Sequence, residues 1–136
     1  KYFSLKKTEI LFKNLNIINI SSIYGIIAPN QKIYTDTKRN SSEIYGATKA
    51  GLIQLTKYFA TRYAKNNIQV NAIAPGGVLN EKHQGPEFIR NYSELVPKKR
   101  LCNDLELVNL IYSILESNCT YLTGQTISID GGMSSW

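Results

Sequence analysis

The stretch YGATKAGLIQLTKYFATRYAKNNIQVNAIAPGG, residues 45–77, decides the fold of this chain. Its first part predicts a long helix from about Tyr45 to Ala64, because apolar side chains recur at helical spacing on two faces. Its second part, from Ile68 to Ala74, is apolar and predicts a buried strand, which Pro75 ends. A long helix that leads directly into a buried strand is typical of α/β folds.

Further elements extend this pattern in both directions. The Ile-rich run from Asn16 to Ser21 predicts another buried strand, so that strand, helix and strand form a crossover unit with parallel strands. Asn103 or Asp104 is expected to cap a helix that ends near Glu116, and Thr126 to Asp130 predicts a last strand. The predicted fold is therefore α/β, a Rossmann-like doubly wound parallel sheet in the order β-α-β-α-β.

The helical patterns also predict which side chains are buried. The first helix is expected to be covered on two faces, one with Leu52, Leu55, Phe59 and Tyr63 and one with Gly46, Ile53, Ala60 and Ala64. The second helix is expected to bury Leu107, Val108, Ile111, Ile114 and Leu115. Residues 2–14 predict the end of an amphipathic helix, and residues 80–100 predict a mobile flap with apolar anchors at Phe88, Ile89 and Leu95.

Composition limits the class of protein. The 136 residues are 43% hydrophobic and 19% charged, as expected for one globular domain over residues 1–136. No apolar run approaches the ~20 residues of a membrane span, and no leader follows Lys1, so we expect a cytoplasmic protein without membrane contact. Cys102 and Cys119 lack metal-ligand spacing, which predicts reduced thiols and no metal site.

The net charge of +6 comes from three separate clusters, at residues 6–7, 38–39 and 98–100. A basic balance can indicate nucleic acid or phosphate-bearing ligands. No helix carries a dense basic stripe, however, and no ladder of aromatic and basic residues appears. We therefore interpret these charges as solvated surface and expect no nucleic-acid partner.

Tyr45 and Lys49 are the clearest candidates for catalytic residues. Four residues apart, they lie on one helical face, where an ammonium is expected to lower the pKa of a phenol and fit it for proton transfer. Such a pair also occurs on ordinary helix surfaces. Ser22 and Pro75-Gly76 each end a predicted strand, and the carboxyl ends of parallel strands form the usual binding edge. Turn and strand-ending roles explain each feature alone, but their joint order favours a site.

Four segments in order resemble the short-chain dehydrogenase/reductase family. They are the strand ending in Ser21-Ser22, the Tyr45-x-x-x-Lys49 helix, residues 70–76 with Pro75-Gly76, and residues 121–132, which are similar to the closing strand of the family. The resemblance implies an NAD(P)-dependent oxidoreductase that acts on a carbonyl or alcohol. It gives Ser22, Tyr45 and Lys49 the catalytic roles, and Tyr45, Lys49, Pro75, Gly76, Val78 and Asn80 the contacts with NAD or NADP.

The resemblance also implies what this sequence lacks. The glycine-rich turn for the cofactor pyrophosphate does not occur, so the chain matches the C-terminal half of the family fold and is expected to be inactive alone. A long segment with Tyr34, Thr35, Asp36 and Lys38 could line a substrate pocket or be an insertion without a role. Similar segments favour a sugar derivative, as in surface-sugar or flagellin-glycan biosynthesis. A homo-oligomer is expected, and a non-catalytic oligomerisation or scaffold module is the alternative.

Overall fold

The computed structural model describes residues 15–35 and 40–135, which form a three-stranded parallel sheet in the order β1-β2-β3. The strands are β1 (Leu15–Ile20), β2 (Ile68–Pro75) and β3 (Thr126–Ile129). The central strand β2 pairs with the whole of β1, from Leu15 opposite Ile68 to Ile20 opposite Ile73, and its second half pairs with β3. The predicted α/β class with a parallel sheet is confirmed.

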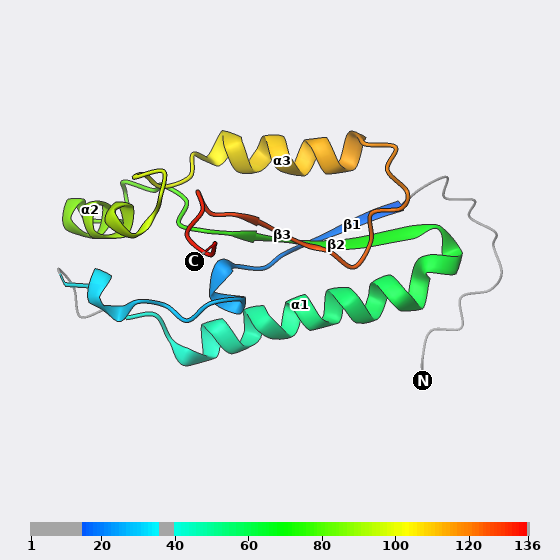
Figure 1. Ribbon diagram of the computed structural model, residues 1–136, viewed down its shortest axis with the longest axis horizontal. Helices are drawn as coiled ribbons and strands as arrows, with labels where there is room; N and C mark the ends of the chain where they lie inside the picture. The colour runs from blue at the N-terminus through cyan, green and yellow to red at the C-terminus, as the bar shows by residue number, and fades with distance from the viewer. Residues whose placement is uncertain (1–14, 36–39, 136) are drawn as a thin grey trace.

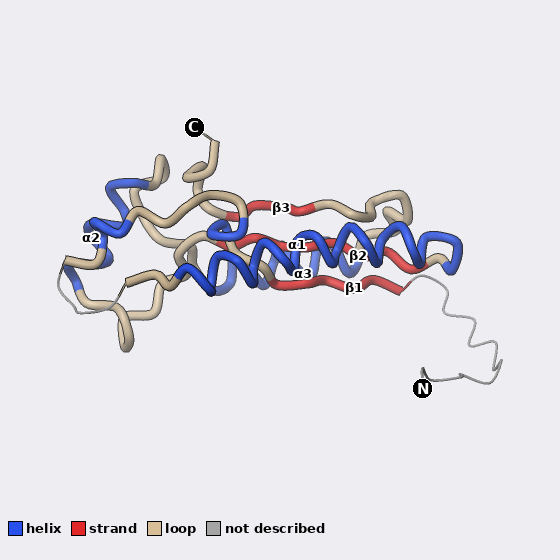
Figure 2. Tube along the Cα trace, turned by 90° about the horizontal axis from the view of Figure 1, so that it is seen from below, coloured by secondary structure: helices blue, strands red, loops and turns tan. Residues whose placement is uncertain are grey.

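Helices cover both faces of this sheet. Helix α1 (Glu43–Tyr63) lies on one face and α3 (Asp104–Glu116) on the other, as Figure 1 shows. Figure 2 shows the three strands side by side, with β2 between its two neighbours. Because β2 is covered on both faces and both edges, its residues from Gln69 to Pro75 are all buried.

The start of each long helix has a side-chain cap. Ser42 caps α1 by accepting a hydrogen bond from the backbone N–H of Ile44. Asn103 caps α3 in a capping box, in which the Glu106 carboxylate in turn accepts the backbone N–H of Asn103 at 2.9 Å. The predicted boundaries of α3 are therefore confirmed, and the predicted start of α1 is two residues late.

The buried stripes of the helices are narrower than the sequence predicts. Thr56 and Ala60 are the buried residues of α1, and the Thr56 hydroxyl accepts a hydrogen bond from the Asn19 side chain of β1 at 2.9 Å. The predicted burial is wrong at Leu55, Val108 and Leu115, which are 49%, 40% and 45% exposed. It is also wrong at Ala64, which is exposed. A sheet of three strands contacts only one line of side chains on each helix, so apolar positions beside that line stay uncovered.

The last strand is fixed by two polar side chains, the buried Asn71 of β2 and the partly buried Thr123 in the turn before β3. The Asn71 amide donates to the carbonyl of Leu122 at 2.8 Å and its oxygen accepts the N–H of Gln125 at 3.0 Å. The Thr123 hydroxyl accepts the N–H of Val70 at 3.0 Å. These bonds set the register of β3 against β2, because a one-residue slip would break all three.

The segment predicted as a flap contains helix α2 (Pro86–Leu95), which contributes to the core. Tyr92 of α2 and Val96, which follows it, are buried in one cluster with Ile23, Ile33, Leu101 and Met133. Phe88, Ile89 and Leu95 pack against this cluster, so they are anchors as predicted, but the description of the segment as a flap is wrong. Two short 3-10 turns, η1 (Ile23–Gly25) and η2 (Gln31–Ile33), supply the other side of the cluster.

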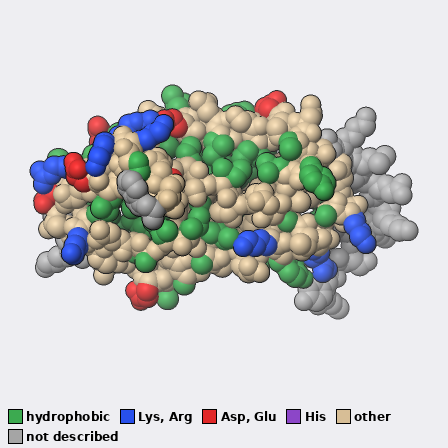
Figure 3. Space-filling model, in the orientation of Figure 1, with side chains coloured by type: hydrophobic (Ala, Val, Ile, Leu, Met, Phe, Trp, Pro, Cys, Tyr) green, Lys and Arg blue, Asp and Glu red, His purple; other side chains and the backbone are tan. Residues whose placement is uncertain are grey.

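Hydrophobic and basic side chains gather on different parts of the surface. Figure 3 shows hydrophobic side chains across the middle of the face on which β3 lies in front, and Lys and Arg mainly at the end that carries α2. On the other side β1 is an edge strand, with Ile17 38% and Ile20 42% exposed. Within residues 15–35 and 40–135, no helix is long and apolar enough to cross a membrane. The helix predicted over residues 2–14, together with Asp36 and Lys38, lies outside the described residues.

Candidate active site

A cavity of about 410 Å³ lies where β1 and β2 end, and three of the predicted site residues line it. Ser22 follows β1, Gly76 follows β2, and Tyr45 stands in the first turn of α1. This is the edge of the sheet at which open α/β folds bind ligands. The structure therefore brings together a hydroxyl, a phenol and the backbone after β2 in one small-molecule-sized cavity.

The end of β1 is fixed against the first turns of α1. Ser22 caps η1, and its hydroxyl oxygen accepts the N–H of Tyr24 at 3.2 Å. Gly25 then touches α1 so closely that a Cβ atom there would lie 2.7 Å from the backbone carbon of Lys49. The Ser21 hydroxyl donates to the carbonyl of Lys49 at 2.8 Å. The two serines thus differ: Ser21 joins β1 to α1, whereas Ser22 lines the cavity.

Lys49 lies behind Tyr45 and at the end of β1. Its ammonium donates to the carbonyl of Ile20 at 3.0 Å and lies 5.6 Å from the centroid of the Tyr45 ring. An ammonium at this distance is attracted by the ring. Lys49 is not among the residues that line the cavity, so it lies against the Tyr45 ring from outside it.

Two further phenols border the cavity, and both are less exposed than Tyr45. Burial raises the pKa of Tyr24, whose ring meets the Tyr45 ring edge-on at 6.5 Å. Burial likewise raises the pKa of Tyr92 to about 12. Among the described residues Tyr24 Oη makes no hydrogen bond, although the Tyr34 phenol is close enough to raise the pKa of Tyr24 further. Tyr45, 44% exposed, is the accessible phenol of this group.

Sequence reasoning missed Tyr92, which holds the loop after β2. Its hydroxyl accepts the N–H of Gly77 at 2.6 Å, and a Cβ atom on Gly77 would lie 2.7 Å from the Tyr92 ring. Only glycine lets the loop approach the ring this closely. A signal existed in the sequence, since Phe88, Tyr92 and Val96 recur at helical spacing.

The remaining predicted cofactor residues lie elsewhere. Val78 and Asn80 line a neighbouring cavity of about 680 Å³, which shares Tyr34, Asn40 and Phe88 with the first. Pro75 is the last residue of β2, buried opposite Ile129 of β3. Of the predicted cofactor residues after α1, Pro75 therefore lies in the sheet, Gly76 lines the first cavity, and Val78 and Asn80 line the second.

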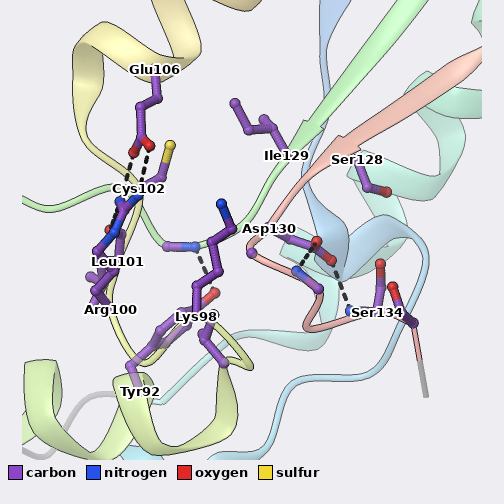
Figure 4. A pocket seen from close by; sticks show the side chains of 15 residues that line it. Tyr92, Lys98, Arg100, Leu101, Cys102, Glu106, Ser128, Ile129, Asp130 and Ser134 are labelled. Carbon is purple, nitrogen blue, oxygen red and sulfur yellow. Dashed lines mark hydrogen bonds and ion pairs between the residues drawn. The ribbon is translucent and has the colours of Figure 1, made fainter.

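A third cavity, of about 480 Å³, lies on the other side of Gly77 and Tyr92 (Figure 4). In it Arg100 forms two hydrogen bonds of 2.7 Å with Glu106, which hold the pKa of that carboxyl at about 2. Opposite, Asp130 accepts the N–H groups of Gly132 and Ser134. The arginine and both carboxylates of this cavity therefore already have protein partners.

Comparison with known proteins agrees with this geometry. A family model described as enoyl-(acyl carrier protein) reductase matches residues 5–134, nearly the whole chain. The chain belongs to the short-chain dehydrogenase/reductase family. The parallel sheet formed by the described residues agrees with this assignment.

Two curated members of the short-chain dehydrogenase/reductase family illustrate its range. The chain is 36% identical over 127 residues to 7alpha-hydroxysteroid dehydrogenase of Bacteroides fragilis, covering 88% of this chain and 43% of that protein. It is 33% identical over 117 residues to post-translational flagellin modification protein A of Campylobacter coli, covering 86% and 45%. The chain thus spans less than half the length of these relatives.

Solved structures of family members match the fold and carry cofactors. A short-chain dehydrogenase from Leptospira borgpetersenii with bound NAD⁺ is 40% identical, with a TM-score of 0.79 over 88% of this chain and 44% of that one. ElxO with bound NADP is 32% identical, with a TM-score of 0.72 over 89% and 47%. Both nicotinamide cofactors therefore occur among proteins similar to this one.

The residues present fit one end of such a cofactor. The Gly76–Gly77 backbone and the Tyr45 phenol share the first cavity, and the Lys49 ammonium lies beside them, which is a suitable donor set for a nicotinamide and its ribose. The sequence contains no G-x-G-x-x-G turn for a pyrophosphate. The fit is therefore to the reactive end of the cofactor, without its phosphates.

Proposed function

We propose that this chain forms the catalytic part of an NAD(P)-dependent oxidoreductase that interconverts an alcohol and a carbonyl in a small molecule. The observation that carries the proposal is the shared cavity of Ser22 and Tyr45, with the Lys49 ammonium 5.6 Å from the Tyr45 ring. A nicotinamide would be held by Tyr45, Lys49, Pro75, Gly76, Val78 and Asn80. When bound, it supplies or accepts the hydride.

Each catalytic side chain has one role in the proposed reaction. Tyr45 donates its proton to the substrate oxygen during reduction and takes it back during oxidation. Lys49 stabilises the phenolate left after donation, because a nearby cation favours the charged form. The Ser22 oxygen already accepts the Tyr24 N–H, so its own proton is available for the substrate oxygen, where it stabilises developing charge.

The proposal also covers the substrate, the cellular location and the oligomeric state of the enzyme. Similarity to the flagellin modification protein supports a sugar derivative as substrate, in surface-sugar or flagellin-glycan biosynthesis. The free thiols of Cys102 and Cys119 support a cytoplasmic location. Exposed apolar residues on α1 and α3, Leu55 and Leu105 among them, support a homo-oligomer. We expect negligible hydride transfer by the 136-residue chain alone, because its sequence contains no G-x-G-x-x-G turn for the pyrophosphate.

The test restores a nucleotide-binding half. The chain is joined to that half of the Leptospira dehydrogenase, and NADH and NADPH oxidation is followed with a panel of small ketones and aldehydes. The Tyr45→Phe variant should lose roughly 10²–10⁴-fold in turnover while it retains cofactor binding, since only the transferable proton is removed. Tyr58→Phe is the matched control, because Tyr58 lies on the same helix, 53% exposed, and lines none of the cavities described above. Equal turnover in Tyr45→Phe and the parent would exclude Tyr45 from the mechanism.

The alternative is a non-catalytic oligomerisation module. It is favoured by the uncovered large apolar side chains on α1 and α3, such as Tyr58 and Tyr112. Sedimentation of the 136-residue chain separates the two functions. A well-folded dimer that persists while the hybrid enzyme shows no turnover would favour the module, and turnover that depends on Tyr45 would exclude it.

A further inference from the structure

The cavity that holds Ser22 and Tyr45 is lined by two further kinds of side chain. Four of its lining residues carry aromatic rings and are called here the aromatic wall: Tyr24, Tyr34, Phe88 and Tyr92. Three carry short polar side chains and are called the polar wall: Asn40, Ser41 and Ser42. A ligand that fills this space therefore meets both aromatic rings and hydrogen-bonding groups.

The aromatic wall is held in place by contacts between η2 and α2. The rings of Tyr34 and Phe88 lie 5.4 Å apart and those of Phe88 and Tyr92 5.8 Å apart, both pairs tilted. Beside Tyr34, the Thr35 hydroxyl donates to the Glu87 carboxylate at 2.7 Å and accepts from the Asn91 amide at 2.9 Å. Two side-chain hydrogen bonds and a row of rings thus join segments that are more than fifty residues apart in the sequence, which fixes the wall before any ligand binds.

The polar wall is anchored equally well but keeps groups available for a ligand. The Gln31 side chain donates to the carbonyl of Ser41 at 2.8 Å and accepts its N–H at 3.0 Å. This backbone is therefore fixed, whereas the Asn40 amide and the Ser41 hydroxyl make no hydrogen bond within residues 15–35 and 40–135. Both side chains line the cavity, so they can donate to and accept from a ligand hydroxyl.

A ligand suited to both walls has a flat C–H face and a rim of hydroxyls. A pyranose ring with equatorial hydroxyls has this shape: its axial C–H bonds alternate between the two ring faces, so that either face can meet the negative face of an aromatic ring, and its hydroxyls point outward. A steroid or fatty acyl group would leave the polar wall without partners, and an open-chain polyol has no face to stack. A polar group that loses water when a ligand binds and gains no partner reduces affinity, so the polar wall selects against apolar rings.

We propose that this cavity binds a pyranose ring, stacked on Tyr34 and Phe88 and hydrogen-bonded by Asn40 and Ser41, so that these four residues determine the specificity of the site. This rests on the proposed function, because it assigns the substrate of that same site. The ring places one of its carbinol carbons toward Ser22 and Tyr45, which line the same cavity. Tyr34 and Phe88 supply affinity for the ring, while Asn40 and Ser41 distinguish a hydroxylated ring from an apolar one.

The experiment measures binding to the 136-residue chain by ligand-observed NMR, which requires no turnover and no cofactor. The probes are methyl β-D-glucopyranoside, cyclohexanol and erythritol, which offer a hydroxylated ring, a ring with one hydroxyl, and hydroxyls without a ring. We expect the pyranoside to bind most tightly. Tyr34→Leu and Phe88→Leu should each weaken its binding roughly three- to tenfold, the factor that corresponds to loss of one aromatic contact.

Controls distinguish the contributions of the aromatic and polar walls to binding, and they distinguish the pyranose assignment from the oxidoreductase function. Tyr58→Leu, at an exposed tyrosine of α1 outside the cavity, should leave pyranoside binding unchanged. Asn40→Ala should weaken the pyranoside but not cyclohexanol. Equal or tighter binding of cyclohexanol, equal binding of erythritol, or no binding of any probe would overturn the pyranose assignment. If that occurs while Tyr45→Phe still abolishes ketone reduction in the hybrid enzyme, the oxidoreductase function stands and only the substrate class falls.

Discussion

The hydrogen bond between Tyr92 and Gly77 gives the sharpest test of how α2 supports the site. In Tyr92→Phe the ring, and hence the wall of both adjoining cavities, is preserved, whereas the acceptor 2.6 Å from the Gly77 N–H is removed (Figure 4). The lost oxygen leaves a partly buried donor without a protein partner. We therefore expect an effect on the loop after β2 without a change in its packing.

The expected size follows from that single bond. Loss of one hydrogen bond with a donor left unpaired costs about 1–2 kcal/mol in the free energy of unfolding. This corresponds to roughly a 5–30-fold change in the population of opened states. Because Tyr92 is only 4% exposed, water cannot replace the bond without local opening.

Two measurements check the expectation. Urea unfolding should report the loss in global stability, and amide hydrogen exchange at Gly77 should accelerate by roughly 5–30-fold if the bond limits local opening. Tyr58→Phe is the control, because the Tyr58 hydroxyl accepts only a long 3.4 Å bond from Arg62 at the surface and its removal should change stability by less than about 0.5 kcal/mol. Unchanged exchange at Gly77 in Tyr92→Phe would refute the reasoning that α2 holds this loop.

Further predictions concern packing, charge and a buried hydroxyl. Gly77→Ala should lower the free energy of unfolding by about 1–3 kcal/mol through overpacking against the Tyr92 ring. Gly51→Ala, with open space around its Cβ in α1, should raise the free energy of unfolding by about 0.5–1 kcal/mol. Chemical denaturation compares the two variants, and changes of the same sign would contradict the close contact between Gly77 and Tyr92. The hydrogen bonds from Arg100 lower the pKa of Glu106 to about 2. The ionised Glu106 carboxylate therefore stabilises the folded state fully above about pH 4.3, and this stabilisation is lost as the pH falls toward 2. Glu106→Gln should remove that part of the acid transition, followed by circular dichroism. Thr56→Val should cost about 1–3 kcal/mol, because it leaves the Asn19 amide unpaired against α1; a neutral effect in thermal unfolding would exclude that bond as a support.

The sequence by itself determined the elements and their order. Apolar runs of strand length, a helix with a continuous apolar pattern and the Asn103 cap are local signals, and they predicted β1, β2, β3, α1 and α3 to within two residues. The convergence of Ser22, Tyr45 and Gly76 on one cavity also follows from the sequence, because parallel strands with helical crossovers bring their carboxyl ends to a common edge. These predictions need no knowledge of long-range packing.

Only the tertiary structure decided which side chains those elements cover and what surrounds the site. Leu55, Val108 and Leu115 follow the helical pattern yet lie exposed, since burial depends on how much sheet lies beneath a helix and not on periodicity alone. Tyr34 and Phe88 meet across more than fifty residues, and Tyr92 binds Gly77 from another element. Such contacts result from the packing of separate segments, whose distances no local pattern encodes, and they form the walls that would select a substrate.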